Sequence, residues 1–308
     1  YVEQPLIDKA EIEKRQDAIA DINKHMITRE ELREYLNPIY DLERLITRVT
    51  YMSANPRDLI AFKNSIGMLP PIKTLLEDFD TELLKELQTD MDPLEELYRL
   101  IDASILEEPP ISVREGGLIK DGYNENVDKY RHAKTEGKTW LAELEAKERE
   151  KTGIKNLKIK FNKVFGYYLE VTNSYRDLVP DYFTRKQTLA NAERYITPEL
   201  KELEDMILGA EDKLINLEYD LFCEVRNRIA AEVVRIQKTA KAVAKLDTFV
   251  SLAVVADQNN YCRPKINENG VIDIKDGRHP VVEKMMNNDM FIANDTYLDN
   301  GNNRISII

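Results

Sequence analysis

Apolar side chains recur at intervals of three and four residues through the first third of the chain, a spacing typical of amphipathic helices. One such stripe contains Leu42, Leu45 and Val49. Turns rich in asparagine and proline separate one stripe from the next. The pattern predicts several short helices that bury their apolar faces against one another. We therefore expect residues 1–121 to form a helical core.

Two longer helices are predicted at residues 122–153 and 199–258. The first is polar nearly all round, which is typical of an exposed connecting helix. The second follows Thr197 and Pro198, a capping residue and a proline suited to a first helical turn. Its apolar stripe has a seven-residue repeat and then slips by four residues after Leu221, a slip that should locally unwind a coiled coil and at which the helix can bend. These features predict a coiled pair of long helices.

Between the two long helices, residues 154–198 change to a period of two. Leu157, Ile159 and Phe161 alternate with lysines, and an aromatic-rich stretch follows. Because both ends of the segment connect to helices of one pair, they must lie close together. We expect four short strands in an antiparallel sheet.

Residues 259–308 change character again. Asparagine and proline end the long helix, and Val271–Ile274 and Arg304–Ile308 are predicted strands. The predicted fold class is therefore mainly α, with a small antiparallel sheet inserted between two long helices and a short β-rich segment at the end.

The charge distribution sets residues 154–198 apart from the rest of the chain. The chain has 308 residues and a net charge of −12, whereas this segment has eight Lys and Arg against four Asp and Glu. We call residues 154–198 the sheet segment. A small positive module between helices is suited to holding a polyanion, and nucleic acid is the leading candidate. The acidic remainder does not exclude such a contact, because charges more than about 8–10 Å apart are largely screened.

Composition narrows the remaining possibilities. No stretch approaches the roughly 18–20 apolar residues of a membrane span. Two cysteines and three scattered histidines suggest neither disulfides nor a metal site. We expect a cytoplasmic protein without a metal.

The candidate phosphate-binding residues have cationic or amide side chains and lie within the sheet segment. Lys and Arg neutralise phosphates, and Asn can position a strand without reading its sequence. The alternative is a solvated sheet edge on which lysines prevent pairing with other chains. Charge alone does not decide between the two. The candidates are Lys158, Lys160, Lys163, Arg185, Lys186, Asn191 and Arg194.

The aromatic residues of the sheet segment have two interpretations as well. Phe165, Tyr167 and Tyr168 have rings on which bases could stack. At this density, however, aromatic residues more often form the core of a small sheet, and we favour the core.

No catalytic constellation stands out in the sequence. His279, in the stretch GRHP, is better explained as a loop or packing residue than as a catalytic one. The phosphate-binding pattern G-x-x-x-x-G-K-[ST] does not occur in the 308 residues. We therefore expect that this chain is not itself an enzyme and binds no cofactor.

Five stretches together resemble one family. They are EEPPISVREGGLIKDGYN (107–124), EKTGIKNLKIK (150–160), NKVFGYYLEVTNS (162–174), RKQTLANAERYITPELKELEDMILGAE (185–211) and GRHPVVE (277–283). On these motifs essentially the whole chain resembles the MutS family of DNA mismatch-repair ATPases. The resemblance implies five parts: a helical core (1–121), a first lever helix (122–153), a DNA clamp (154–198), a second lever helix (199–258) and the incomplete beginning of an ABC-type ATPase domain (259–308).

The resemblance also implies what the full-length parent binds. Phe291 and Ile292 match the family position beside the adenine of a nucleotide, and the strand matching RISII leads into the P-loop, so we expect the chain to end just before it. ATP and Mg²⁺ are implied for a parent ATPase, together with mismatched double-stranded DNA, a homodimer and a MutL-type repair partner. The family's mismatch-reading wedge would precede Tyr1. One departure is Ala190, where members often have Lys, which puts that phosphate contact in doubt.

Taken together, these observations predict the clamp and lever portion of a mismatch-recognition ATPase. The clamp would contact duplex phosphates without sequence preference, and the levers would couple the ATPase state to clamp closure. The alternative is a coiled-coil scaffold whose sheet domain binds a protein partner. Such a scaffold would hold its partner with little dependence on salt.

Overall fold

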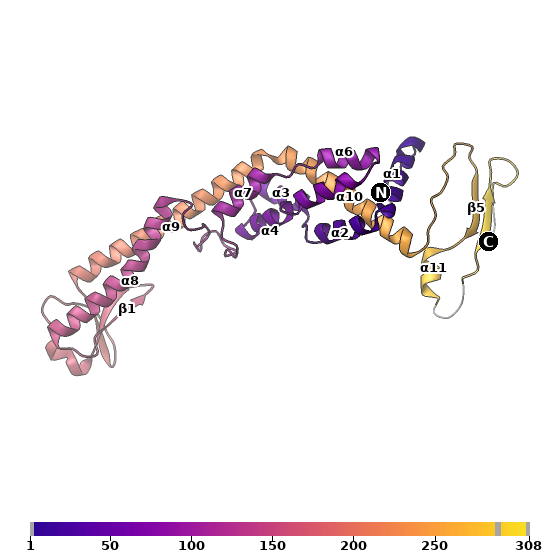
Figure 1. The fold of residues 1–308 in the computed structure, drawn as a ribbon. Coiled ribbons are helices and arrows are strands. Elements are labelled where there is room, and N and C mark those ends of the chain that lie inside the picture. Colours follow the sequence, from indigo (N-terminus) through magenta and orange to yellow (C-terminus); the bar gives the residue numbers. More distant parts are fainter. Residues whose placement is uncertain (1–2, 287–290, 306–308) are drawn as a thin grey trace. The chain divides into compact units, whose positions relative to one another are not determined.

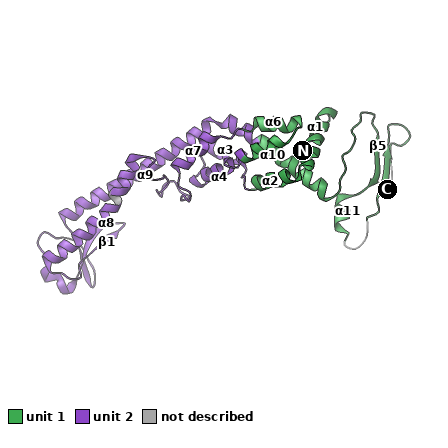
Figure 2. Cartoon of the chain, viewed as in Figure 1, with its two compact units in different colours: residues 1–37, 71–91, 241–308 green, residues 38–70, 92–240 purple. Residues whose placement is uncertain are grey.

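The computed structural model describes residues 3–286 and 291–305 and is mainly helical, with two small antiparallel sheets (Figure 1). This confirms the predicted fold class. Contacts divide the chain into two compact units, coloured separately in Figure 2. Unit 1 comprises residues 1–37, 71–91 and 241–308, and unit 2 comprises residues 38–70 and 92–240. The two units are defined by contacts within the chain and not by function. The division into core, two lever helices, clamp and start of an ATPase domain therefore stays a prediction.

In unit 1, the first helix packs against the second and against the helix at residues 82–90. The buried carboxylate of Asp21 accepts hydrogen bonds from the backbone N–H groups of Asp80 and Thr81, at 3.0 and 3.1 Å. Unit 1 contains α1 (Lys9–Lys24), α2 (Met26–Leu36), the 3-10 turn η1 (Leu76–Asp78), α6 (Glu82–Asp90), β5 (Ile272–Gly277), α11 (Pro280–Met285) and β6 (Asn294–Leu298).

Unit 2 contains the remaining core helices, the two long helices and the four-stranded sheet. α5 (Leu69–Leu75) and α10 (Val233–Gln258) contribute residues to both units. The elements of unit 2 are α3 (Leu42–Thr50), α4 (Pro56–Ile66), α7 (Glu95–Ser104), α8 (Glu125–Thr152), β1 (Lys158–Asn162), β2 (Gly166–Thr172), the 3-10 turn η2 (Asn173–Leu178), β3 (Thr184–Thr188), β4 (Ala192–Ile196) and α9 (Pro198–Ala231).

Side-chain caps begin both long helices, and Thr197 does so where the sequence predicts it. Asn124 accepts hydrogen bonds from the first amides of α8, and Thr197 caps α9 with Pro198 in its first position. α8 ends at Gly153, whose φ of 71° is the left-handed conformation that glycine adopts without strain. These local signals fix both ends of the inserted sheet.

α8 and α9 pack side by side in opposite directions. The fully buried carboxylate of Glu218 on α9 accepts hydrogen bonds from Arg131 on α8, at 2.7 Å, and from the backbone N–H of Gly117, at 2.5 Å. At the other end of the pair, Lys147 contacts Glu199 at 2.8 Å. The two helices are therefore joined at the core and again beside the sheet.

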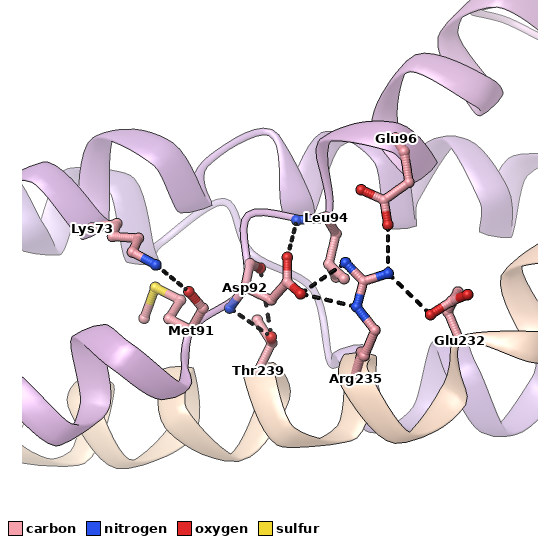
Figure 3. Close-up of polar contacts among 8 residues, drawn as sticks. All are labelled: Lys73, Met91, Asp92, Leu94, Glu96, Glu232, Arg235 and Thr239. Carbon is pink, nitrogen blue, oxygen red and sulfur yellow. Dashed lines mark hydrogen bonds and ion pairs between the residues drawn. The ribbon is translucent and has the colours of Figure 1, made fainter.

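The slip after Leu221 does not interrupt the helix. α9 runs without interruption through this region, because Leu221, Phe222 and Val225 are all buried and the helix stays packed on both sides of the slip. The helical pattern is interrupted instead at Glu232, close to a polar cluster around Arg235 (Figure 3).

The C-terminal segment differs from its prediction in two places. The predicted strand over Val271–Ile274 corresponds to β5, but β6 and α11 were not predicted, because five and six residues are too few to show a period. Of the predicted strand Arg304–Ile308, the first two residues are not in a strand, and residues 306–308 lie outside the described part of the chain.

Candidate nucleic-acid interface

The four-stranded sheet has the order β1-β2-β4-β3, with all neighbours antiparallel. One of its faces packs on the two long helices. Side chains of α8, α9 and the sheet share a buried cluster that fixes the sheet to the helix pair. The cluster includes Leu141, Leu144, Leu157, Leu169, Val171, Tyr195, Leu200 and Ile207.

Helix carboxylates also hold the sheet. Glu145 of α8 accepts a hydrogen bond from the backbone N–H of Ile159 in β1, at 2.7 Å. The buried Glu204 of α9 accepts one from the N–H of Tyr167 in β2, at 2.5 Å. Gly166 precedes Tyr167 with a φ of 75°, and a Cβ there would collide with the Glu204 carboxylate. Glutamates of the two helices thus accept hydrogen bonds from backbone N–H groups of the sheet, in addition to the apolar contact between helices and sheet.

The opposite face of the sheet has a row of polar residues. Lys158, Glu170, Arg194 and Gln187 lie opposite one another across the four strands, and Lys160 shares their face because side chains alternate along β1. The Lys160 ammonium lies 2.7 Å from Glu170, and this hydrogen bond raises the pKa of Lys160. The row is therefore mixed in charge.

Arg194 is held within that row. Its guanidinium lies over the ring of Tyr168, 4.4 Å from the centroid, and donates a hydrogen bond to Gln187 at 2.8 Å. Its Nε is buried and has no hydrogen-bond partner among the described residues. These contacts fix the side chain in one orientation and leave less of it for a phosphate.

Arg185 lies on the helix-packed face, opposite Tyr195. Its guanidinium is 3.4 Å from the buried Glu193, which also contacts Arg176 at 3.6 Å and accepts a hydrogen bond from the Tyr195 hydroxyl. This hydrogen bond, with the two arginines, lowers the pKa of Glu193 against the effect of burial. Burial, followed by the contact with Glu193, raises the pKa of Tyr195 to about 12.

The remaining candidates lie in turns and at an edge. Lys163 is in the β1–β2 turn and Asn191 in the β3–β4 turn, at opposite ends of the sheet. Lys186 lies at the irregularity in β3 between Arg185 and Gln187, where it has no partner in the ladder. All three side chains are exposed.

The structure therefore divides the seven candidates. Lys160 and Arg185 are neutralised by glutamates, and Arg194 is held by a ring and an amide. The charged candidates that have no ion pair, side-chain hydrogen bond or ring contact with any described residue are Lys158, Lys163 and Lys186. Whether any of the seven contacts DNA stays a prediction.

The aromatic residues of the sheet segment differ in their exposure to solvent. Tyr168 is buried, as the core interpretation expects, and Tyr167 packs against the apolar cluster. Val164 and Phe165, in the β1–β2 turn, are 81% and 50% exposed. The turn therefore has apolar side chains at its surface beside Lys163.

The carboxylates that position these side chains do not stand out in the sequence. Glu193 lies in a strand and Glu204 in a helix, and both resemble the many solvated acids of the chain. Their partners are brought to them by sheet register and by helix packing, which sequence spacing does not reveal. Arg176 was counted in the net charge of the segment and was not named as a candidate.

The family position beside adenine is represented by Phe291, which is half-buried, and Ile292, which is 81% exposed. Both offer only apolar contact. Within the described residues, no three His, Cys, Asp or Glu side chains form a group able to hold a metal ion.

Among the described helices, none combines the length and apolar character needed to cross a membrane.

Comparisons with known proteins add an independent line of evidence. A family model described as MutS domain III matches residues 1–253. The DNA mismatch repair protein MutS of Lachnoclostridium phytofermentans is 66% identical over 308 residues, which is 100% of this chain and 33% of that protein. The protein of the same name from Acetivibrio thermocellus is 53% identical over 308 residues, covering 35% of its length. The chain thus spans about a third of the length of the curated relatives it matches.

Proposed function

Because the chain belongs to the MutS family of DNA mismatch-repair proteins, we propose that its sheet segment is a clamp that holds double-stranded DNA through the sugar-phosphate backbone. The observation that carries the proposal is that three of the candidate lysines, Lys158, Lys163 and Lys186, are exposed and have no ion pair among the described residues. Their charges are available to phosphates without first breaking an internal contact. Binding of this kind does not depend on base sequence.

The paired cations have a supporting role in this proposal. Lys160 and Arg185 already bond to glutamates, so a phosphate must compete with Glu170 or Glu193 for them. Arg194 stacks on Tyr168 and contributes positive potential from a fixed position. Asn191 is exposed in the β3–β4 turn and can donate from its amide to a phosphate oxygen.

The two long helices act as levers in the proposed mechanism. α8 and α9 are joined at the core by Glu218 and Arg131, and beside the sheet by Lys147 and Glu199. A pair joined at both ends moves as one body, so a displacement at the core reaches the sheet segment. In this way the levers couple the ATPase state of the whole protein to clamp closure.

Further properties are proposed for the whole protein, of which this chain spans about a third of the relatives' length. It is a cytoplasmic ATPase that uses ATP and Mg²⁺, bound largely by residues outside this chain. Phe291 and Ile292 provide apolar contacts to adenine. It forms a homodimer on mismatched double-stranded DNA and binds a MutL-type repair partner.

Charge reversal at the free lysines tests the clamp. The triple variant Lys158→Glu, Lys163→Glu and Lys186→Glu should weaken duplex binding by roughly tenfold or more at low salt, because three phosphate contacts become repulsive. The matched control is Lys241→Glu, Lys245→Glu and Lys265→Glu, which changes the net charge equally at exposed positions of α10 and the segment after it. The control should change affinity by less than about twofold. Equal losses in the two variants would show that net charge, and not the sheet segment, determines binding.

One observation favours the alternative, a sheet domain that binds protein. Val164 and Phe165 expose apolar surface in the β1–β2 turn. A charged DNA backbone gains little from apolar contact, whereas a protein partner can bury such a surface. The double variant Val164→Ser and Phe165→Ser should leave duplex affinity nearly unchanged if the clamp proposal is correct. Loss of a salt-insensitive protein contact in this variant, with no duplex binding by the unmodified chain, would favour the scaffold instead.

A further inference from the structure

Arg278 lies between β5 and α11, in the stretch GRHP, which neither the clamp nor the lever helices explain. α11 follows at Pro280, and His279 caps it by accepting a hydrogen bond from the N–H of Val282 at 3.3 Å. The histidine therefore has a local structural role. Arg278 instead contacts two segments, one that precedes it in the chain and one that follows it.

The first contact of Arg278 is with the C-terminal end of α10. The helix ends in a turn in which the N–H of Tyr261 bonds to the carbonyl of Ala256 at 2.9 Å, and Asn260 is left-handed with a φ of 52°. Nη2 of Arg278 donates to the carbonyls of Asn259 and Asn260, at 2.9 and 3.0 Å. A cation is favoured at this position because the C-terminal end of a helix carries partial negative charge.

The second contact of Arg278 is with α11. Nη1 donates to Glu283 at 3.0 Å, and the guanidinium lies 5.8 Å from the centroid of the Tyr261 ring. Both charged side chains are about one-third exposed, so water screens the ion pair only in part. One planar group therefore bonds to the end of α10 through one nitrogen and to α11 through the other.

From this geometry we propose that Arg278 is a positioning residue that transmits movement of the β5–α11 segment to α10. The inference rests on the proposed function, together with the expectation that residues 259–308 begin an ATPase domain and that α10 is part of the second lever helix (199–258). Arg278 has no role in the chemistry of hydrolysis. It sets the position of α11 relative to the end of α10.

Arginine suits this position for a geometric reason. Its fork of N–H donors is rigid and planar, so the two ends of the guanidinium bond in fixed relative directions. A lysine keeps the charge at the end of α10 but has a single nitrogen on a flexible stem. Arg278→Lys should therefore retain part of the contact with the carbonyls and lose the fixed position of α11.

Amide hydrogen exchange on the 308-residue chain tests the contact itself. Arg278→Ala should raise exchange at residues 255–261 and in α11 by roughly tenfold, the factor expected when a charge-assisted hydrogen bond is lost. The matched control is Arg304→Ala, because Arg304 also donates to a backbone carbonyl, that of Asn300 at 2.7 Å, within its own loop. The control should leave exchange at 255–261 unchanged. Unchanged exchange in Arg278→Ala would overturn the proposal.

Coupling is tested in a full-length protein that contains this chain. The readout is the ratio of duplex dissociation constants with and without ATP, measured beside the ATP hydrolysis rate without DNA. Arg278→Ala should bring the ratio close to one, with hydrolysis changed by less than about threefold, whereas Arg278→Lys should give an intermediate ratio. An unaltered ratio in Arg278→Ala would overturn the coupling.

The two arms separate this inference from the proposed function. If the unmodified full-length protein did not bind duplexes, the proposed function would fail, and the exchange experiment would still decide whether Arg278 joins α10 to α11. If the protein binds duplexes and responds to ATP equally with and without Arg278, only the coupling role fails.

Discussion

Arg235 donates hydrogen bonds from Nε and Nη2 to the same oxygen of Asp92, at 2.9 and 2.8 Å (Figure 3). Its Nη1 donates to Glu96 at 2.6 Å and to Glu232 at 3.0 Å. Glu232 is the residue at which the helical pattern between α9 and α10 is interrupted. The hydrogen bond to Asp92, followed by those to Glu232 and Glu96, raises the pKa of Arg235. Through Arg235, the interrupted segment at Glu232 is therefore held against the turn at Asp92 that precedes α7.

Removing this guanidinium should destabilise the chain. Arg235→Ala should lower the free energy of unfolding by about 1 kcal/mol, a modest value because the partners are more than one-third exposed and water screens them. The measurement is urea denaturation at neutral pH. Arg99→Ala is the control, because Arg99 on an exposed helix surface pairs, among the described residues, only with Glu95, at 2.8 Å. It should cost less than about 0.5 kcal/mol, and equal costs would show that the cluster adds nothing beyond one surface pair.

Gly137 lets α8 approach α9 closely. A Cβ at this position would lie 2.6 Å from Cγ1 of Ile207, a β-branched side chain that cannot easily move away. Gly137→Ala should therefore destabilise the chain by about 1–3 kcal/mol, although alanine favours the helix by about 1 kcal/mol. Gly209→Ala, on α9, is the control, because a Cβ there has no heavy atom within 4 Å among the described residues. It should stabilise the chain by about 0.5–1 kcal/mol. Thermal denaturation of both variants should move in opposite directions, and a stabilised Gly137→Ala would refute the close approach.

Glu193 should make the sheet segment sensitive to acid. Its pKa is lowered below the ordinary value of 4.5, by the Tyr195 hydroxyl first and then by Arg176 and Arg185. A group whose pKa is lower in the folded state stabilises the fold above its unfolded pKa, and this stabilisation is lost as the pH falls through the folded value. Between pH 7 and pH 3, the urea midpoint should fall more for the unmodified chain than for Glu193→Gln. Parallel curves for the two proteins would contradict this.

Glu204 should hold the β1–β2 turn in place. Its carboxylate accepts a hydrogen bond from the N–H of Tyr167 and lies 2.5 Å from Lys201. Glu204→Gln weakens the charge-assisted bond, so amide exchange at Tyr167 and trypsin cleavage after Lys163 should both become faster by roughly threefold to tenfold. Glu202→Gln, an exposed neighbour on the same helix, is the control and should change neither rate. Similar rates in the two variants would show that Glu204 does not hold the β1–β2 turn.

Local signals are sufficient to predict most of the helices. Thr197 and Pro198 start α9 where they were expected, and Asn124 and Gly153 bound α8 close to the predicted limits of residues 122 and 153. The alternation of Leu157, Ile159 and Phe161 with lysines led to the four strands. In each case the residues that determine the element lie within it or next to it.

The features that were missed depend on residues far apart in the chain. The interruption at Glu232 occurs where Arg235 contacts Asp92, more than 140 positions away. Arg185 and Arg194 lie on opposite faces because of strand register and an irregularity in β3. Their pairing with Glu193 and Tyr168 follows from that register. Sequence therefore identified the cations of the sheet segment and could not tell which of them are already neutralised.

The salt dependence of duplex binding tests the clamp most directly. Three free lysines on phosphates predict a slope of log K against log salt of roughly −2.7 for the unmodified chain. With Lys158, Lys163 and Lys186 replaced by Gln, the slope should fall close to zero, whereas Gln at Lys241, Lys245 and Lys265 should leave it unchanged. A slope that is the same in all three proteins would contradict the assignment of phosphate contacts to the sheet segment.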